Sequence, residues 1–481
     1  MSYKIKINKD EYRSKLHGCW MGKAIGGAIG MPYELTKEIN SATGFSTPKG
    51  EPVPNDDLDL QLVWLLAMED VGPKTLSANA LADYWLTYIT PHWNEYAVCR
   101  ANMEMGLLPP LSGQFKNKWL HSNGAWIRSE IWASLAPGVP NIAMKYALMD
   151  ACLDHGLGEG TYAEMFTVTM QSFAMYENDV RKLIETALTY IPHDCRVAQS
   201  VRLVLEYYDS GRPWQETREA VVKLNDDLGL FQAPGNVAFT VLGLMYGEGD
   251  FKKSVLLCVN CGDDADCTAA TCGALLGLMN GIEYIPEDWK EYIGDRIVTM
   301  CINGSYICRL PKTCSELTER IMNLMPSVMK IYGIDVEYTD DKTNIDEIKD
   351  IKILEGYAQS IFERSPYSFE ISNGLHTDAL IEYDCEPVVK AGEDFKVKIT
   401  LTNNRASAHH HRMDVFLPEG WTAEYDRTCF ADQRTRITTN QSKWEMTIHV
   451  GERVDAVNRI PIMISTSSHA LPIMVPIVLL G

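Results

Sequence analysis

Apolar side chains recur at helical spacing along most of the first two thirds of the chain. Residues 196–208 and 214–224 place apolar groups three or four positions apart, and Pro213 stands where a helix begins. Loops rich in Gly and Pro, such as 106–113 and 136–140, separate the helical segments. Because no run of alternating residues interrupts this pattern, we expect residues 1–330 to form an all-α domain.

The pattern changes after a charged segment over residues 331–365, which we interpret as a connector. Residues 395–402 alternate strictly between apolar and polar groups, as a half-buried strand does. Residues 414–421 are expected to form a strand followed by a turn, and further strands are expected over 444–450, 460–464 and 473–480. Short strands separated by turns predict an Ig-like β-sandwich over residues 366–481 that is separable and provides no metal ligand. The fold class is therefore multi-domain, all-α followed by all-β.

Length and charge narrow the class of protein. The 481 residues exceed one ordinary core and favour two domains. The net charge of -20 disfavours nucleic acid as a partner, because such binding depends on Lys and Arg. No apolar run is long enough to span a bilayer, and no secretory leader is recognised. The 13 cysteines are interpreted as reduced thiols, so we expect a cytoplasmic protein.

The first stretch with possible chemistry is a glycine-rich segment. Glycines recur at 18, 22, 26 and 30, which on a helix gives one bare stripe against which another backbone can pack. Neither a dinucleotide fingerprint nor a phosphate-binding loop fits the spacing. We therefore interpret the glycines as packing residues, and note that Glu34 follows the helix directly.

Two further stretches carry closely spaced carboxylates. Asp56 and Asp57 follow Asn55 at the start of an apolar helix, where acids also favour the helix dipole. Adjacent carboxylates repel each other unless a cation lies between them. Asp264 and Asp266 lie in a loop that enters a small-residue helix, and their spacing suits oxygen coordination of a hard divalent ion.

Together these stretches resemble the ADP-ribosylglycohydrolase family, of the ADP-ribosyl-dinitrogen reductase glycohydrolase type. The family pattern is a glycine-rich helix ending in Glu, then Thr-Asp-Asp-Thr, then Gly-Gly-Asp-x-Asp-Thr before a small-residue helix. Residues 123–128, Asn-Gly-Ala-Trp-Ile-Arg, resemble a further family segment, and His155 falls where members often have His. The resemblance covers roughly residues 10–325. The sequence departs from the pattern at four positions: Gly27, Asn55, Leu58 and Cys267.

The resemblance implies a hydrolase of an ADP-ribosyl bond, N- or O-glycosidic, or of a related ribosyl bond, with two Mg²⁺ or Mn²⁺ ions. It implies Glu34, Asp57 and Asp264 as catalytic residues. The metal positions it implies are Asn55, Asp56, Asp57, Asp264, Asp266 and Cys267. The residues it implies for substrate binding are Asn123, Arg128 and His155.

Cys267 stands where the family has Thr, and two arrangements are open. Either the sulfur turns away from the metal, with a water or Thr268 in its place, or it ligates and changes the metal preference. Because the other predicted ligands are oxygens, we expect the first arrangement.

Other function classes also stay open. One is a metal-independent carboxylate-pair glycosidase with a carbohydrate-binding sandwich, and the other is a non-catalytic binding relative. The partner is a small molecule or an ADP-ribosylated substrate, whose leaving group the sequence does not define. Residues 409–411, three consecutive histidines, are expected in a polar loop of the sandwich, with metal binding as the alternative.

Overall fold

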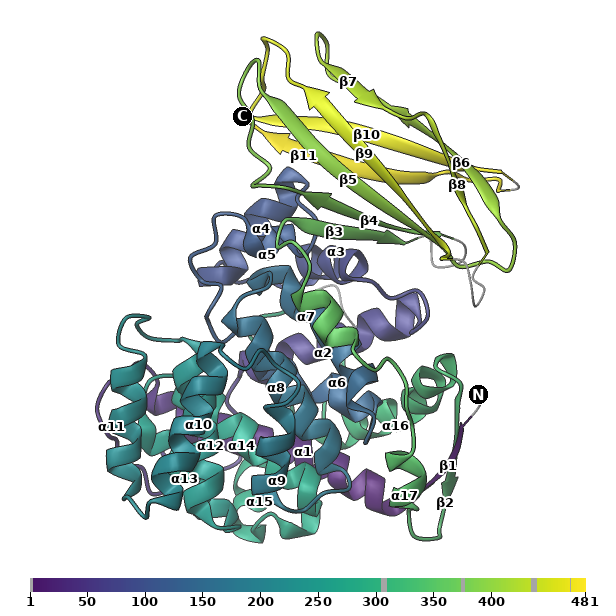
Figure 1. Cartoon of the computed structure of the whole chain (residues 1–481). Coiled ribbons are helices and arrows are strands. Elements are labelled where there is room, and N and C mark those ends of the chain that lie inside the picture. Colours follow the sequence, from purple (N-terminus) through teal and green to yellow (C-terminus); the bar gives the residue numbers. More distant parts are fainter. Residues whose placement is uncertain (1–2, 304–308, 373–376, 434–438, 468) are drawn as a thin grey trace. The chain divides into compact units, whose positions relative to one another are not determined.

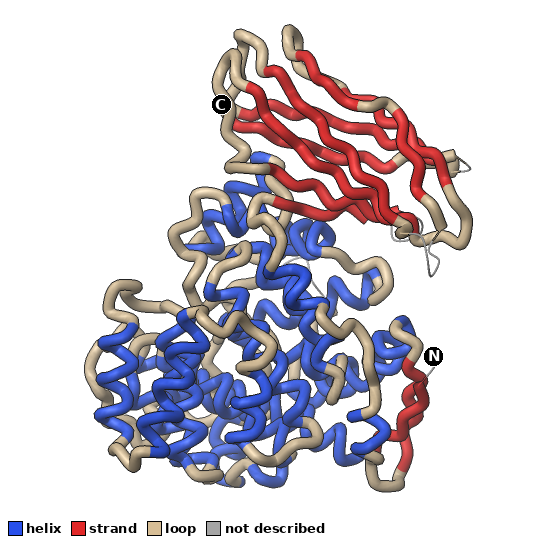
Figure 2. Tube along the Cα trace, viewed as in Figure 1, coloured by secondary structure: helices blue, strands red, loops and turns tan. Residues whose placement is uncertain are grey.

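The computed structural model describes residues 3–303, 309–372, 377–433, 439–467 and 469–481. The chain forms two compact units (Figure 1). The first unit comprises residues 1–96, 118–151 and 157–362, and the second comprises 97–117, 152–156 and 363–481. Helices dominate the first unit and strands the second (Figure 2), which confirms the predicted fold class.

The helices of the first unit follow the predicted apolar periodicity, and α10 and α11 coincide with two of the segments named from the sequence. The helices are α1 (Lys9–Gly30), η1 (Met31–Tyr33), α2 (Asp56–Val71), α3 (Ala78–Tyr88), η2 (Trp126–Arg128), α6 (Glu130–Leu135), α8 (Glu159–Ala174), α9 (Val180–Ala187), α10 (Arg196–Asp209), α11 (Trp214–Leu224), α12 (Ala233–Gly247), α13 (Phe251–Cys261), α14 (Ala265–Asn280), η3 (Ile282–Tyr284), α15 (Glu287–Ile293), α16 (Cys314–Ile331), α17 (Ile345–Lys349) and α18 (Tyr357–Phe362). Helices α4 (Asn94–Met105) and α7 (Pro140–His155) each contribute residues to both units. None of the helices described is long and apolar enough to cross a membrane.

The segment expected as a connector is part of the first unit. Strand β2 (Ile334–Thr339) pairs in parallel with the N-terminal strand β1 (Tyr3–Asn8), from Tyr3 opposite Ile334 to Asn8 opposite Thr339. Helices α17 and α18 follow before the second unit resumes at residue 363. A hydrogen-bonded ladder therefore ties residues 334–339 to the first strand of the chain.

The glycine stripe of α1 packs directly on α14. A Cβ added at Gly18 would lie 2.8 Å from the carbonyl oxygen of Gly277, and one at Gly22 would overlap the carbonyl of Gly273. Gly26 and Gly30 meet the backbone of α14 in the same way. The packing role predicted for the glycines is confirmed. This packing holds the end of α1, which precedes Glu34, at a fixed separation from the start of α14, which carries Asp266.

We expect Gly22→Ala to destabilise the protein by about 3 kcal/mol, because two packed backbones must separate to admit one methyl group. Chemical denaturation of the full chain measures the change. Gly235→Ala in α12 is the control, since the nearest atom to its added Cβ is 4.0 Å away, in Asn225. That control should be neutral or stabilising by up to about 1 kcal/mol. Equal stability of the two variants would contradict the packing account.

The second unit is built on two antiparallel sheets that share one apolar core. One sheet has the order β3-β4-β5-β9-β7 and the other β11-β10-β6-β8. Buried side chains from both sheets, including Ile399, Trp444 and Ile462, form the common core. The strands are β3 (Ser368–Ser372), β4 (Thr377–Tyr383), β5 (Asp394–Asn403), β6 (His409–Val415), β7 (Thr422–Tyr425), β8 (Thr428–Ala431), β9 (Gln441–His449), β10 (Val457–Thr466) and β11 (Ile473–Leu480).

Residues far from the sandwich in sequence complete its core. Leu107, Leu111 and Phe115 are buried together with the strand residues, and α5 (Leu111–Gln114) lies in this segment. The expected boundaries differ from this arrangement, because they assign all of residues 1–330 to one domain. A cut near residue 350 would remove these three side chains from the core of the sandwich, so they bear on its separability, which stays a prediction.

The three histidines at 409–411 lie on strand β6, so the expectation of a polar loop was wrong. His409 and His411 are buried, whereas His410 is exposed, which is the alternation of a half-buried strand. The Nδ1 atom of His411 lies 2.8 Å from the Thr466 hydroxyl on β10. This pairing gives at least one of the histidines a structural role.

Candidate active site

A short backbone bridge brings the glycine-rich helix and the Asp264 loop together. The amide of Leu35 donates to the carbonyl of Asp263 (2.9 Å), and the amide of Asp263 donates to the carbonyl of Thr36 (2.6 Å). Asp263 has a φ of 61° and its Oδ1 accepts from the amide of Phe231 at 2.8 Å. Asp263 therefore shapes the loop, while Glu34 and Asp264 on either side of this bridge are directed to the site.

Two helix N-termini supply the remaining carboxylates. Asn55 caps α2 by accepting the Asp57 amide at 2.7 Å, so that Asp56 and Asp57 occupy the first turn. Asp264 precedes α14 directly, and Asp266 lies in its first turn. The positive end of a helix dipole stabilises anions, which lets both helices hold carboxylates at a buried position.

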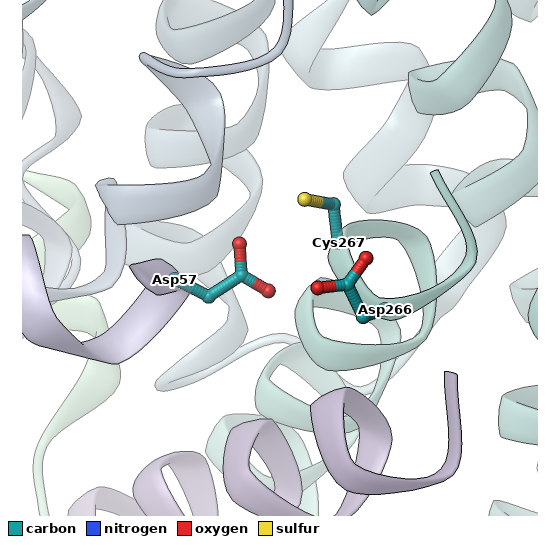
Figure 3. A group of neighbouring side chains, drawn as sticks. All are labelled: Asp57, Asp266 and Cys267. Atoms are coloured by element: carbon teal, nitrogen blue, oxygen red, sulfur yellow. The ribbon is translucent and has the colours of Figure 1, made fainter. Parts of the chain in front are cut away.

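The carboxylates converge on one small volume. Ligand atoms of Asp57, Asp266 and Cys267 all lie within 4.8 Å of one another, and those of Glu34, Asp264 and Asp266 form a second such group. Figure 3 shows the Asp57 carboxylate directed across the site toward the Asp266 carboxylate and the Cys267 sulfur. Asp266 belongs to both groups and thus joins them.

Several of these oxygens have no hydrogen-bond partner among the described residues. Both carboxylate oxygens of Asp57 and one of Asp266 are buried in this way. A buried charged oxygen without a partner is costly, so this arrangement fits residues that hold a cation.

The crowding of acids changes their ionisation. Burial, with repulsion from Asp266 and Asp56, raises the pKa of Glu34 to about 7. Burial and repulsion from Asp266 likewise raise the pKa of Asp56 to about 7. For Asp57 and Asp264 burial raises the pKa well above its ordinary value, and nearby Lys23 opposes this rise at Asp57. Without a cation, the cluster therefore retains protons near neutral pH.

The cluster lies at the edge of a cavity of about 590 Å³ in the first unit. Trp93, Tyr96 and Phe231 provide aromatic surface there, with Trp93 and Tyr96 stacked at 6.3 Å between ring centroids. The cavity is lined by Met31, Glu34, Leu35, Asn55, Asp56, His92, Trp93, Asn94, Glu95, Tyr96, Asn123, Gly124, Ile127, Phe231, Asp264, Asp266, Cys267 and Met300. Aromatic faces beside a polar cluster suit a ligand with a planar ring and several hydroxyl groups.

The sequence profile of the ADP-ribosylglycohydrolase family matches residues 8–325. The chain belongs to this family. ADP-ribosylhydrolase ARH3 of Bos taurus is 23% identical over 329 residues, covering 58% of this chain and 88% of ARH3. An uncharacterized protein of Archaeoglobus fulgidus is 28% identical over 298 residues, covering 59% of this chain and 92% of its own. ADP-ribosylarginine hydrolase Tri1 of Pseudomonas putida is 36% identical over 52 residues, covering 11% of this chain and 14% of Tri1.

Family membership identifies the chain as a hydrolase of ADP-ribosyl linkages.

The residues at which the sequence departs from the family pattern have defined positions in the structure. Gly27 and Asn55 are complementary, because a Cβ at Gly27 would overlap the Asn55 side-chain amide. That amide nitrogen lies 3.4 Å from Asp266 Oδ2, while the side-chain oxygen is engaged in capping α2. Asn55 thus contacts the Asp266 carboxylate and the backbone amide of Asp57, and its expected role as a metal ligand stays a prediction. Leu58 is buried in α2.

The three expected substrate contacts have different positions in this ADP-ribosylglycohydrolase. Asn123 lines the cavity, and its amide donates to Asp264 Oδ2 at 2.6 Å. Arg128 does not line the cavity: it is fully buried, with Nε 2.7 Å from Asp150 Oδ1. This position does not support the expected substrate contact, which stays a prediction. His155 lies in the second unit, where Nδ1 is 2.8 Å from Asp154 Oδ1. Its contact with substrate stays a prediction.

A buried polar network behind the carboxylates was not predicted from the sequence. Lys23 lies on α1 with Nζ 2.9 Å from Glu130 Oε1, and both side chains are buried. Gln61 donates both to Glu130 Oε2 and to the carbonyl of Asp57, each at 2.9 Å. The network therefore anchors the first turn of α2. Lys23 is the one charged residue between Gly18 and Gly30 of this helix, and that was an available signal.

We expect Lys23→Met to destabilise the protein by about 3 kcal/mol, because it leaves the Glu130 carboxylate buried without its cation. The double variant Lys23→Met/Glu130→Gln should recover part of this loss, since neither charge remains. Denaturant unfolding of the three proteins measures both effects. If Lys23→Met alone were as stable as wild type, the ion pair between Lys23 and Glu130 would not stabilise the site.

Proposed function

We propose that the chain is a divalent-metal-dependent hydrolase that cleaves an ADP-ribosyl bond, N- or O-glycosidic, or a related ribosyl bond. The observation that carries the proposal is that two clusters of possible ligand residues share Asp266. Within them, buried carboxylate oxygens of Asp57 and Asp266 lack hydrogen-bond partners among the described residues. Hard oxygen donors in this number suit Mg²⁺ or Mn²⁺. Asp56, Asp57, Asp264 and Asp266 would hold two such ions.

When bound, the ions supply a positive charge that orients two substrate oxygens and lowers the pKa of water. The chain's own residues have the complementary tasks. Asn123 holds the Asp264 carboxylate in place through its side-chain amide. The aromatic wall at Trp93 and Tyr96 faces the cavity and provides a surface for a planar ring.

Glu34 is the residue we assign to the attacking water. It lies at the cavity edge, half-buried, with its carboxylate within 4.8 Å of those of Asp264 and Asp266. A carboxylate there can accept the proton of the water that attacks the anomeric carbon, as the bond to the leaving group breaks through an oxocarbenium-like transition state. Glu34 therefore acts as a general base.

The test is release of ADP-ribose from ADP-ribosylated peptides, measured with the full chain before and after chelation. An arginine-linked substrate is the first to use, because Tri1 is named for that linkage; serine-linked and ester-linked substrates follow. We expect EDTA to abolish release and Mn²⁺ or Mg²⁺ to restore it. Release that persists in EDTA would favour a metal-independent glycosidase, and no release from any substrate would favour a binding relative.

A further inference from the structure

Cys267 presents its sulfur to the carboxylate cluster, contrary to the expectation that it turns away. The residue lies in the first turn of α14, beside Asp266, and its side chain is buried. The sulfur lies within 4.8 Å of carboxylate oxygens of Asp57 and Asp266 (Figure 3). The thiol thus lies close to residues from both stretches that would hold the ions.

The hydroxyl of the next residue does not replace this sulfur. Thr268 Oγ1 donates to the carbonyl of Ala265 at 3.1 Å, inside α14 itself. Near the sulfur, both oxygens of Asp57 and one of Asp266 are buried without a hydrogen-bond partner among the described residues. One sulfur and several carboxylate oxygens therefore surround the same small volume.

We propose that Cys267 Sγ is a ligand of one of the two cations, and that this position therefore selects a softer divalent ion such as Zn²⁺ or Co²⁺ over Mg²⁺. The proposal rests on the proposed function, because it assumes that the cluster binds cations. Thiolate is a soft donor that favours ions of the zinc type, whereas Mg²⁺ binds oxygen. Coordination also removes the thiol proton, so the ligand would be the thiolate.

The experiment is a Co²⁺ titration of the metal-free full-length protein, followed by absorption spectroscopy. A thiolate bound to Co²⁺ gives a near-ultraviolet charge-transfer band that oxygen ligands do not give. We expect this band in wild type and in Cys272→Ser, which changes another buried cysteine of α14. We expect the band to be absent from Cys267→Ser and Cys267→Thr. Competition titrations should show that both Cys267 variants lose Zn²⁺ affinity relative to Mg²⁺ on the order of 100-fold.

The outcomes separate this proposal from the one on which it rests. Co²⁺ binding by wild type without the charge-transfer band would overturn the sulfur ligand and leave the metal centre intact. An unchanged ratio of Zn²⁺ to Mg²⁺ affinity in Cys267→Ser would have the same meaning. If wild type binds neither Co²⁺ nor Mg²⁺, the metal centre itself fails. The wild-type spectrum alone can overturn the sulfur ligand, so this part of the test does not depend on whether a variant folds.

Discussion

Replacing Asp57 or Asp264 by Asn should reduce the hydrolysis rate by about 10³-fold or more, since the electrostatic stabilisation at stake is several kcal/mol. Each substitution keeps the size of the side chain and removes one negative charge from the cluster. Asp57 is buried within α2, and its oxygens lack partners among the described residues. No hydrogen bond to these oxygens is therefore lost, so the fold should survive. Initial rates of ADP-ribose release, with circular dichroism as the check on folding, measure the effect.

The matched control is Asp263→Asn, which changes the acid next to Asp264. Asp263 does not line the cavity, and its Oδ1 accepts from the Phe231 amide. An Asn oxygen can accept the same bond, and Asn tolerates the positive φ of this residue. Activity near that of wild type is expected for the control. A folded Asp57→Asn or Asp264→Asn variant with full activity would remove these carboxylates from the mechanism.

Divalent cations should stabilise the folded protein strongly. A ligand that binds only the native state at a free concentration of 100 times its Kd contributes about 2.7 kcal/mol, so two ions contribute about 5 kcal/mol. The corresponding rise in the melting temperature is about 5–10 °C. Thermal unfolding of the full chain with and without Mn²⁺ measures it. Asp264→Asn should show a much smaller rise, and an equal rise in wild type and variant would place the ions elsewhere.

The size of this stabilisation should depend on pH. In the metal-free protein the pKa values of Glu34 and Asp56 are raised to about 7 by burial and by neighbouring acids. The folded state therefore binds more protons than the unfolded state between about pH 4 and about pH 7, so the stability of the metal-free protein falls as the pH rises through that range. Cations favour the ionised carboxylates and offset this loss. The rise in melting temperature with Mn²⁺ should thus be larger at about pH 8 than at about pH 5.

Those parts of the site that depend on residue type and local position could be predicted from the sequence. Adjacent acids at a helix start, and alternating acids before a small-residue helix, mark Asp56, Asp57, Asp264 and Asp266 without a structure. The glycine stripe was predicted for the same reason, because helical spacing alone aligns its four members. The structure adds that the stripe packs on α14, which is how the first and third stretches meet.

Features that depend on partners distant in sequence were not predictable in this way. Arg128 has the same residue type whether it binds substrate or Asp150, and only the fold shows the latter. Leu107, Leu111 and Phe115 have apolar spacing that fits either unit, yet they are buried with the strands. Strand β2 was not predicted within the charged segment, because its partner β1 is more than 300 residues away in the sequence.

The sulfur of Cys267 was predicted to turn away from the metal position, whereas in the structure it faces the carboxylates. The expectation treated the site as a set of hard oxygens that a thiol would avoid. In the structure the sulfur is directed inward and lies within 4.8 Å of carboxylate oxygens of Asp57 and Asp266. A sequence comparison by residue type alone does not include such a contact.

The carboxylate cluster should hold two divalent cations, and the metal content of the protein tests this most directly. The full chain is stripped with a chelator, dialysed against Mn²⁺, freed of unbound ion and analysed by elemental mass spectrometry. We expect about two Mn²⁺ ions per wild-type chain and a clear reduction in Asp57→Asn and Asp264→Asn. Wild-type protein without bound Mn²⁺, or an equal Mn²⁺ content in all three proteins, would contradict it.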